Sequence, residues 1–290
     1  MNTETKHPNE MVMDIITAEK VNKKFKLKQG QNINNNGVAS NQIEVLSGFD
    51  LKIKKGEFLV LVGPSGSGKS VFLDLVGGLS TPTDGVVYLD GKPVEAPNAN
   101  TAYVFQQYAL FPWRTALSNI EFGLESRGVL KEERVKIARE LLSLFGLSDF
   151  EDRFPYQLSG GMQQRVAIAR ALATKPEVLL MDEPFAALDA QTREILQNEL
   201  IRIWEGTETT VIFVTHSIDE AVFLADRVAV VTARPGRIKE IIEIDLPRPR
   251  NGELRSSKEF AANRHKVWGA LKAEVNKAQQ DWKLAPVFSE

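Results

Sequence analysis

Two segments of this chain place glycine and a hydroxyl side chain directly before a helical run. The first, Gly63–Ser70, reads GPSGSGKS and fits the pattern G-x-x-x-x-G-K-S. The second, Leu158–Arg165, reads LSGGMQQR and leads into an apolar-rich run. Backbone N–H groups at a helix N-terminus bind anions, a hydroxyl can cap the helix, and glycine lets a ligand approach closely. Both segments therefore predict contacts with phosphate.

The first segment has the surroundings of a genuine phosphate-binding loop. A short apolar strand over 56–62 leads into it and a helix over 69–77 follows, which separates it from a chance glycine-rich turn. Its backbone N–H groups would surround the β- and γ-phosphates, Lys69 would add a positive charge, and the Ser70 hydroxyl would ligate Mg²⁺. The residues expected to bind the nucleotide here are Gly63, Pro64, Ser65, Gly66, Ser67, Gly68, Lys69 and Ser70.

Two carboxylates follow the apolar strand predicted over 178–181. Sheets of α/β proteins present ligands at the C-terminal ends of their strands, so Asp182 and Glu183 should lie at the same edge as the phosphate loop. We expect Asp182 to hold Mg²⁺, directly or through water, and Glu183 to polarise an attacking water. The alternative, a solvated acidic turn, is disfavoured by the apolar strand before it.

Two further polar residues end predicted strands. His216 follows the strand over 210–214, and Gln106 follows the strand over 102–105. A lone histidine is more often structural than catalytic, and Gln107 competes with Gln106. The positions alone leave both questions open.

Taken in order, these motifs resemble those of the ABC ATPases over roughly residues 14–235. The resemblance implies that Gln106, favoured over Gln107 by the preceding aromatic, touches Mg²⁺ and the water, and that His216 contacts the γ-phosphate. It implies an α/β fold of the P-loop NTPase class and ABC ATPase type. Such a fold has a mostly parallel core sheet with helices, an antiparallel β part and an inserted α-helical subdomain.

The same resemblance gives the second glycine segment a partner. Ser159, Gly160 and Gly161 would close over ATP held by a second copy of the chain, and Asp189 in AALD would cross that dimer interface. Phe25 matches the aromatic residue that stacks on adenine, although a lone aromatic in a strand could equally belong to the core.

The chain divides into three predicted parts. Residues 1–13 form a disordered lead, 14–250 an ABC ATPase domain with its helical subdomain at about 107–170, and 251–290 a C-terminal helical tail. The Asn-rich stretch 28–42 is interpreted as a long, mobile hairpin connection in a surface loop. The tail helix should bury one stripe formed by Phe260, Val267, Trp268, Leu271 and Val275. The roles of the stretch and of the tail stay open.

Composition excludes several other classes of protein. The 290 residues carry 38 acidic and 36 basic side chains, for a net charge of −2, which is not the footprint of a nucleic-acid-binding protein. Cysteine is absent, which excludes disulfides and thiol chemistry and suits a reducing cytoplasm. No apolar run approaches the roughly 18 residues of a membrane-spanning helix, so attachment to a membrane would require other subunits.

Two stretches resemble the nitrate/sulfonate/taurine group of importers: LFPWRTALSNIEFGL at 110–124 and ARPGRIKEIIEIDLPRPR at 233–250. This resemblance implies an ATP-hydrolysing subunit at the cytoplasmic face of the membrane that energises uptake of a small anion. Its partners would be a second copy, integral membrane permease subunits and, indirectly, a solute-binding protein. Trp113 would sit in the permease contact or pack the small core of the insertion.

Two other interpretations stay open. A soluble ABC ATPase acting on nucleic acid or ribosomes is the main alternative. The segment 251–290 could also serve as a regulatory module that senses a ligand.

Overall fold

The computed structural model describes residues 13–26, 33–35 and 38–284. Apart from Met13, the predicted lead over 1–13 lies outside the described residues, as does much of the Asn-rich stretch. Within that stretch, β2 (Ile33–Asn35) and β3 (Val38–Ser40) pair as an antiparallel hairpin between two long strands.

A six-stranded sheet forms the centre of the molecule, with the order β12-β11-β5-β10-β9-β8. Its strands are β5 (Phe58–Val62), β8 (Thr101–Val104), β9 (Val178–Asp182), β10 (Thr210–Thr215), β11 (Arg227–Val231) and β12 (Ile238–Glu243). All neighbours run parallel except β12, which pairs antiparallel with β11 at the edge. Runs such as FLVLV in β5 are apolar at every position because both faces of the sheet are covered.

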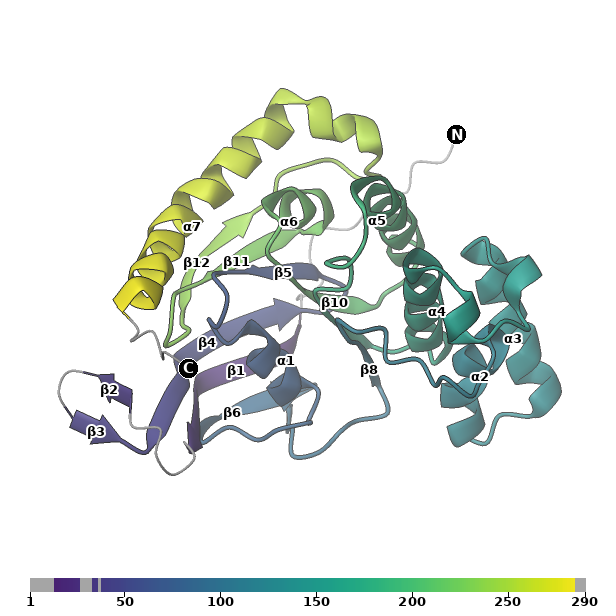
Figure 1. Ribbon diagram of the computed structural model, residues 1–290, viewed down its shortest axis with the longest axis horizontal. Coiled ribbons are helices and arrows are strands. Elements are labelled where there is room, and N and C mark those ends of the chain that lie inside the picture. The colour runs from purple at the N-terminus through teal and green to yellow at the C-terminus, as the bar shows by residue number, and fades with distance from the viewer. Residues whose placement is uncertain (1–12, 27–32, 36–37, 285–290) are drawn as a thin grey trace, which may run out of the picture.

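Side-chain alternation along β5 divides the interior into two cores. Phe58, Val60 and Val62 face the helices, whereas Leu59 and Leu61 face a second sheet. That sheet is antiparallel with the order β4-β1-β6-β7 and consists of β1 (Asp14–Lys26), β4 (Gln42–Lys54), β6 (Asp84–Leu89) and β7 (Lys92–Pro93). Helix α1 (Lys69–Val76) packs into the core between the two sheets, where the rings of Phe49 and Phe72 lie 4.6 Å apart (Figure 1).

Helices occupy the other face and one end of the molecule. Helices α5 (Ala190–Trp204) and α6 (Ile218–Leu224) contribute to the core on the helical face of the central sheet. At the end farthest from β12 lie α2 (Ala116–Ser126), α3 (Lys131–Leu144) and α4 (Gly160–Ala173), which pack on one another (Figure 1). Short 3-10 turns at Ser148–Phe150 and Pro155–Gln157 connect α3 to α4.

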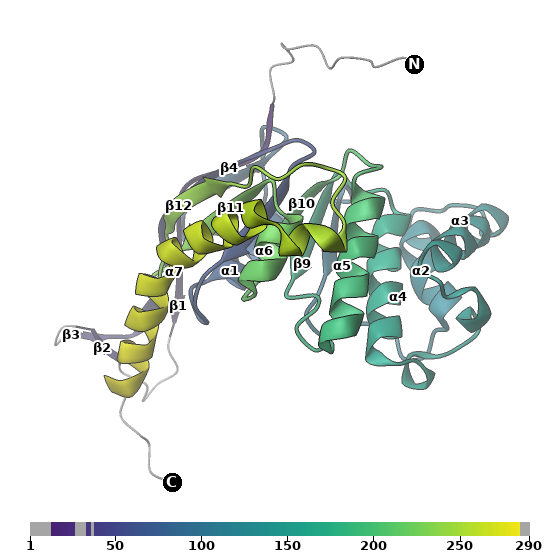
Figure 2. The same cartoon turned by 90° about the horizontal axis from the view of Figure 1, so that it is seen from above.

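The chain ends in the long helix α7 (Lys258–Leu284), which follows a 3-10 turn at Gly252–Ser256. It lies across α6, β11 and β12, at the opposite end from α2 and α3 (Figure 2). The face of α7 that packs on these elements buries Phe260, Val267 and Leu271, whereas Trp268 of the same helix is 43% exposed. The predicted stripe is therefore wrong at Trp268, which lies one helical position away from Val267 and points off the buried face.

The predicted fold class is confirmed: a mostly parallel core sheet covered by helices, with an antiparallel sheet beside it. Strand β12 was not expected, because its sequence IKEIIE mixes charged and apolar residues as an exposed edge strand does. Among residues 13–26, 33–35 and 38–284, no helix combines the length and the apolar character required to cross a membrane.

Candidate functional site

Four motif segments emerge side by side at one edge of the central sheet. The register sets Val62 of β5 beside Thr215 of β10, and Val214 of β10 beside Asp182 of β9. Met181 of β9 in turn pairs with Val104 of β8. The phosphate loop, His216, Glu183 and Gln106 follow these strands, so the sheet brings together residues that are far apart in the sequence.

The phosphate loop holds its lysine in the interior. The Lys69 ammonium is buried and donates to the Gly63 carbonyl at 2.9 Å, the Pro64 carbonyl at 3.0 Å and the Ser67 hydroxyl at 3.2 Å. Burial lowers the pKa of Lys69 to about 8, although the carboxylates of Glu183 and Asp182 oppose the shift. The loop thus contains a cation that an anion would further stabilise.

Gly68 joins this loop to helix α1 in a conformation that only glycine adopts readily. Its φ is +90°, and a Cβ there would lie 2.6 Å from the Leu46 side chain. The first turn of α1 is therefore pinned against strand β4.

A pair of hard oxygen ligands lies beside the loop. The Ser70 hydroxyl donates to Asp182 Oδ1 at 3.0 Å. Burial raises the pKa of Asp182, while the hydrogen bond from Ser70 counteracts that rise. Hydroxyl and carboxylate oxygens suit Mg²⁺, which binds through one or two protein groups plus substrate phosphates and water. The described part of the chain has no cluster of three His, Cys, Asp or Glu residues that would form a metal site without the substrate.

Glu183 and His216 form a direct contact. Nε2 of His216 lies 2.6 Å from Oε1 of Glu183, and the hydrogen bond from this histidine lowers the pKa of Glu183. Glu183 has a φ of +45°, and its N–H donates to the Val214 carbonyl of the neighbouring strand at 3.0 Å. A non-glycine residue in this left-handed region is strained and is held there by its surroundings. The arrangement aims an ionised carboxylate at the edge of the sheet.

Gln106, Gln107 and Phe25 all have exposed side chains. Both glutamines lie within three residues of the end of β8, so their position does not choose between them. Phe25 lies near the end of β1, with the Lys23 ammonium 5.2 Å from its ring centroid, and belongs to neither core. The core interpretation of Phe25 is therefore wrong, whereas its contact with adenine stays a prediction.

The second glycine segment forms the N-terminus of α4. The exposed Ser159 caps this helix by accepting a hydrogen bond from Met162 N–H at 3.3 Å. A Cβ at Gly160 would lie 2.9 Å from the Tyr108 hydroxyl, and one at Gly161 would lie 2.7 Å from the Thr192 methyl. These glycines allow close packing against the segments that follow β8 and β9, which fixes the start of the helix.

Asp189 is the N-cap of α5, and its Oδ1 accepts from Thr192 N–H at 3.0 Å. The hydrogen bonds from Thr192 lower the pKa of Asp189. The exposed carboxylate therefore has a structural role in its own chain, beside any role at an interface.

A buried acid that sequence reasoning missed ties these segments together. Glu220 of α6 is 6% exposed and accepts hydrogen bonds from the Thr215 hydroxyl and from Gln197 Nε2. Arg193 lies 3.7 Å from the same carboxylate and donates to the Leu188 carbonyl at 2.8 Å. Glu220 thereby links Thr215, the residue before His216, through Arg193 to Leu188, the residue before Asp189. The signal in the sequence is that this acidic residue directly precedes the apolar run 221–225. The structure shows that this whole run is buried.

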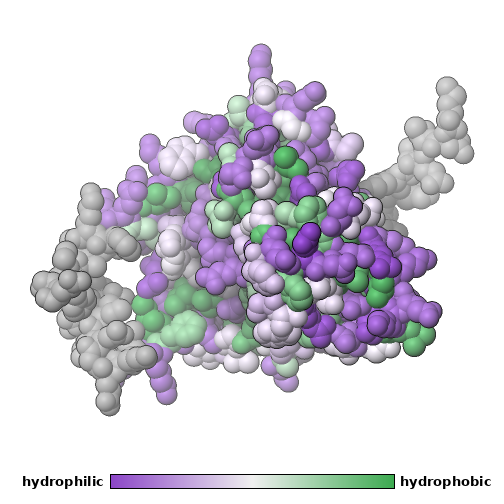
Figure 3. All heavy atoms as spheres, turned by 45° about the vertical axis from the view of Figure 1, so that its right-hand side comes forward, coloured by the Kyte–Doolittle hydropathy of each residue, from purple (hydrophilic) through white to green (hydrophobic). Residues whose placement is uncertain are grey.

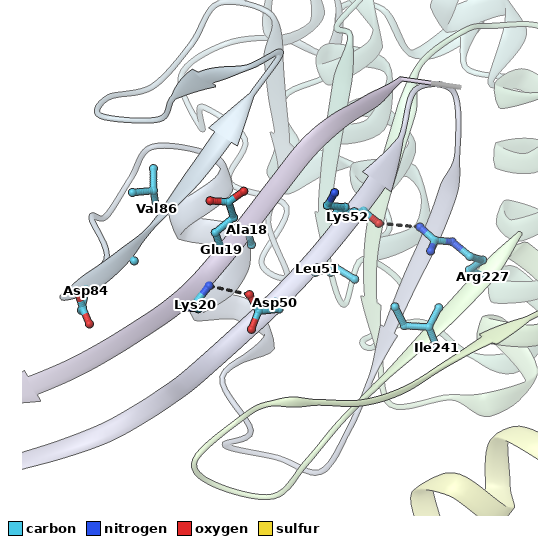
Figure 4. A pocket seen from close by; sticks show the side chains of 11 residues that line it. Ala18, Glu19, Lys20, Asp50, Leu51, Lys52, Asp84, Val86, Arg227 and Ile241 are labelled. Carbon is cyan, nitrogen blue, oxygen red and sulfur yellow. Dashed lines mark hydrogen bonds between the residues drawn. The ribbon is translucent and has the colours of Figure 1, made fainter. Parts of the chain in front are cut away.

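A separate hollow lies on the antiparallel sheet, away from this edge (Figure 4). It has a volume of about 800 Å³ and is open to solvent. Much of its polar lining is already paired: Lys20 N–H donates to Asp50 at 2.8 Å, and Arg227 donates to the Lys52 carbonyl and to Glu57. This hollow holds none of the motif residues, so the sheet edge remains the candidate site.

Comparisons with known proteins show the family of the chain. A family model described as ABC transporter matches residues 46–186. An uncharacterized ABC transporter ATP-binding protein of Methanocaldococcus jannaschii is 58% identical over 238 residues, which cover 82% of this chain and 88% of that protein. The chain belongs to the ABC transporter ATP-binding family.

Other members of the ABC family carry names that specify transport. The nitrate import ATP-binding protein NrtD of Synechocystis is 49% identical over 205 residues, covering 71% of this chain and 77% of NrtD. The bicarbonate transport ATP-binding protein CmpC of Synechococcus elongatus is 45% identical over 263 residues, covering 90% of this chain but 37% of CmpC. The chain is thus similar to ATP-binding proteins whose names specify nitrate import and bicarbonate transport.

Solved ABC structures share the architecture. One is a dimeric ATP-binding cassette in a post-hydrolysis state bound to ADP and Pi, with 36% identity and a TM-score of 0.68 over 80% of this chain and 100% of that chain. A second dimeric structure, described as a bacterial ABC transporter cassette, has a TM-score of 0.69 at the same identity and coverage.

At the helical end of this ABC subunit, Trp113 is 72% exposed. Its ring lies 5.7 Å from Phe111, which packs on Phe122 at 4.5 Å, with the Arg114 guanidinium 4.9 Å from the Phe122 ring. The space-filling view that brings this end forward shows a mainly hydrophilic surface with small hydrophobic patches (Figure 3). The interpretation that Trp113 packs the core of the insertion is therefore wrong.

Proposed function

We propose that this chain is the ATP-hydrolysing subunit of a bacterial ABC importer that takes up a small anion. The observation that carries the proposal is the sheet edge itself, where the phosphate loop, the Ser70–Asp182 pair and the Glu183–His216 pair emerge from adjacent parallel strands. This arrangement has the parts of a phosphoryl-transfer site: hydrogen-bond donors to phosphate, metal ligands and a group that orients water.

Each residue then has a distinct task in hydrolysis. The loop N–H groups and Lys69 bind the β- and γ-phosphates, while Glu183 holds the attacking water in line with the γ-phosphate. In this proposal His216 orients Glu183 through the 2.6 Å contact and also contacts the γ-phosphate. Ser70 and Asp182, with Gln106, would hold Mg²⁺, which neutralises phosphate charge when bound.

A complete site requires two copies of the chain. In this proposal Ser159, Gly160 and Gly161 of one copy cover the γ-phosphate of ATP bound by the other, and Asp189 lies at their interface. The dimeric solved relatives support such an arrangement. ATP binds the closed dimer more tightly than the open one, and this difference in affinity drives closure.

Closure would be transmitted to a permease at the helical end. Trp113 offers an exposed aromatic side chain there, of the kind that anchors protein–protein contacts. The peripheral subunit would thus act at the cytoplasmic face of the membrane and power a permease, which in turn receives anions from a solute-binding protein. The sequence resemblance predicts nitrate, a sulfonate or taurine as the anion. The names of the relatives support nitrate and add bicarbonate.

Purification of the tagged chain from membranes tests this role. An integral membrane protein with several spans should copurify in stoichiometric amount, and Trp113→Ala should reduce its yield while leaving ATP binding intact. Leu130→Ala, at another exposed apolar residue of the helical end, is the matched control. Copurification of ribosomes or nucleic acid in place of a membrane protein would contradict the proposal and support the soluble alternative.

A further inference from the structure

The turn that joins β11 to β12, Thr232–Arg237, lies directly behind the phosphate loop. Arg234 Nε donates to the Gly66 carbonyl at 3.3 Å. Gly236 packs so tightly that a Cβ there would lie 2.0 Å from the Ser67 carbonyl oxygen. The loop therefore rests on this turn along two consecutive residues.

Strand β4 fixes the turn from a second side. Gly236 N–H donates to the Val45 carbonyl at 2.8 Å, and Ser47 N–H donates to the Gly236 carbonyl at 3.1 Å. Gly236 therefore cannot move without breaking two backbone hydrogen bonds.

The contact made by Arg234 suits a loop that presents N–H groups to phosphate. Carbonyl groups on the outer side of such a loop need partners, and a guanidinium supplies a charged donor. A hydrogen bond to one end of a peptide unit also strengthens the dipole at its other end. Arg234 is thus placed to hold the Gly66 carbonyl outward, while the Ser67 N–H of the same peptide unit donates to the Pro64 carbonyl within the loop at 3.3 Å.

The C-terminal helix holds the same turn from a third side. Glu274 of α7 accepts a hydrogen bond from Ala233 N–H at 3.0 Å through Oε2, and its Oε1 lies 2.8 Å from Lys239 Nζ. Lys239 also donates to the Ala270 carbonyl at 2.9 Å. The Glu274 side chain is only 13% exposed, which shields both contacts from water.

We propose that Arg234 is a positioning residue for the phosphate loop and that α7, through Glu274, holds Arg234 in place. The tail thereby supports nucleotide binding from behind the loop and requires no ligand of its own. This inference rests on the proposed function, because it assumes that the loop binds ATP.

Affinity for ATP, measured by calorimetry on the full chain, tests the role of Arg234. Arg234→Ala should weaken ATP binding about fivefold, the equivalent of one hydrogen bond. It should raise KM for ATP and leave kcat nearly unchanged, since Arg234 touches neither Glu183 nor His216. Arg234→Lys should recover part of the affinity by keeping the charge.

The matched control is Arg237→Ala in the same turn. Arg237 Nη2 donates to the Ser47 hydroxyl at 3.1 Å rather than to the phosphate loop, so its loss should leave ATP affinity unchanged.

Variants of Glu274 test the link to the tail. Glu274→Ala should weaken ATP binding in the same direction as Arg234→Ala, and Glu274→Gln should have a smaller effect because its amide oxygen still accepts from Ala233. If Glu274 acts through Arg234, the double variant Arg234→Ala/Glu274→Ala should be little worse than Arg234→Ala alone. Arg264→Ala, which removes an exposed ion pair with Asp219 from the same helix, is the control.

Equal ATP affinity for Arg234→Ala and Arg237→Ala would overturn the inference while the proposed function stands. Full additivity of the Arg234 and Glu274 effects would overturn the role of α7. Failure of the wild-type chain to bind ATP would instead contradict the proposed function and, with it, the premise of this inference. Thermal unfolding of each variant shows whether the fold is kept, and Glu274→Gln keeps the test decisive if Glu274→Ala unfolds.

Discussion

The N-termini of α1 and α4 are both glycine-rich helix starts, yet they are built differently. The first encloses the buried ammonium of Lys69 and sets Ser70 3.0 Å from Asp182, so it combines N–H groups, a cation and metal ligands. The second offers N–H groups and the Ser159 hydroxyl, which already caps its own helix. Under the proposed function, this difference means that the α1 end binds the nucleotide by itself, whereas the α4 end completes a site in another copy of the chain.

Substitutions at the two helix starts should therefore separate binding from turnover, and this is the largest effect expected. Lys69→Met should weaken ATP binding about 10- to 100-fold, because a charged contact with phosphate is lost. Ser159→Arg should leave ATP affinity within about twofold and reduce ATPase activity at least about 100-fold, since the completed site contributes transition-state contacts. Calorimetry and a phosphate-release assay measure the two quantities.

Ser159→Thr, which keeps a capping hydroxyl, is the control for the second substitution. Normal turnover by Ser159→Arg would remove the α4 end from the active site, and lost ATP binding would show that the two ends act within one chain.

The lowered pKa of Lys69 should make ATP affinity depend on pH at the α1 end. The expected effect is smaller than that of the substitutions above. With a pKa of about 8 in the free protein, Lys69 is half deprotonated at pH 8, and bound phosphate favours the charged form. ATP binding at pH 8 should therefore take up about half a proton, and affinity should fall as the pH rises above 8. Calorimetry in buffers of different ionisation enthalpy measures this uptake.

The α4 end should not contribute to the proton uptake that accompanies ATP binding. Ser159→Arg should show the same proton uptake as the wild type. A pH-independent affinity between pH 7 and 9 would mean that Lys69 is fully charged before the nucleotide arrives.

The smallest expected effects concern helix capping. Asp189→Ala and Ser159→Ala should each lower the free energy of unfolding by about 1 kcal/mol, because each removes the side-chain acceptor at a helix N-terminus. Asp189→Asn should restore most of the stability, since asparagine caps equally well. Denaturant titration checks these values; a loss of ATPase activity in Asp189→Asn at full stability would assign the negative charge itself to the interface.

Much of the sheet edge could be predicted because its signals are local. A strand such as 178–181 is apolar at every position and then changes abruptly to Asp182, so both the strand and the polar residue at its end are readable from the sequence. Parallel pairing then requires that the residues after such strands converge. The 2.6 Å contact between Glu183 and His216 follows from this topology, although the strained φ of Glu183 had no sequence signal.

The parts that escaped prediction depend on long-range packing. Arg234 and Gly66 are 168 residues apart, and nothing in the pattern ARPGR indicates that it would meet the phosphate loop. Glu220 looked like an ordinary acidic residue at the start of a helix, because its partners come from other elements. Trp268 looked apolar enough for the buried stripe, but its neighbour Val267 takes the inward position.

The central claim, that the α4 end of one copy completes the α1 end of another, is tested most directly by light scattering on Glu183→Gln with ATP and Mg²⁺. Because this variant should bind ATP without hydrolysing it, the account predicts a dimer in the presence of ATP and a monomer in its absence. Adding Ser159→Arg to the same chain should abolish the dimer while ATP stays bound. A Glu183→Gln chain that remains monomeric in saturating ATP, or a double variant that dimerises equally well, would contradict the account.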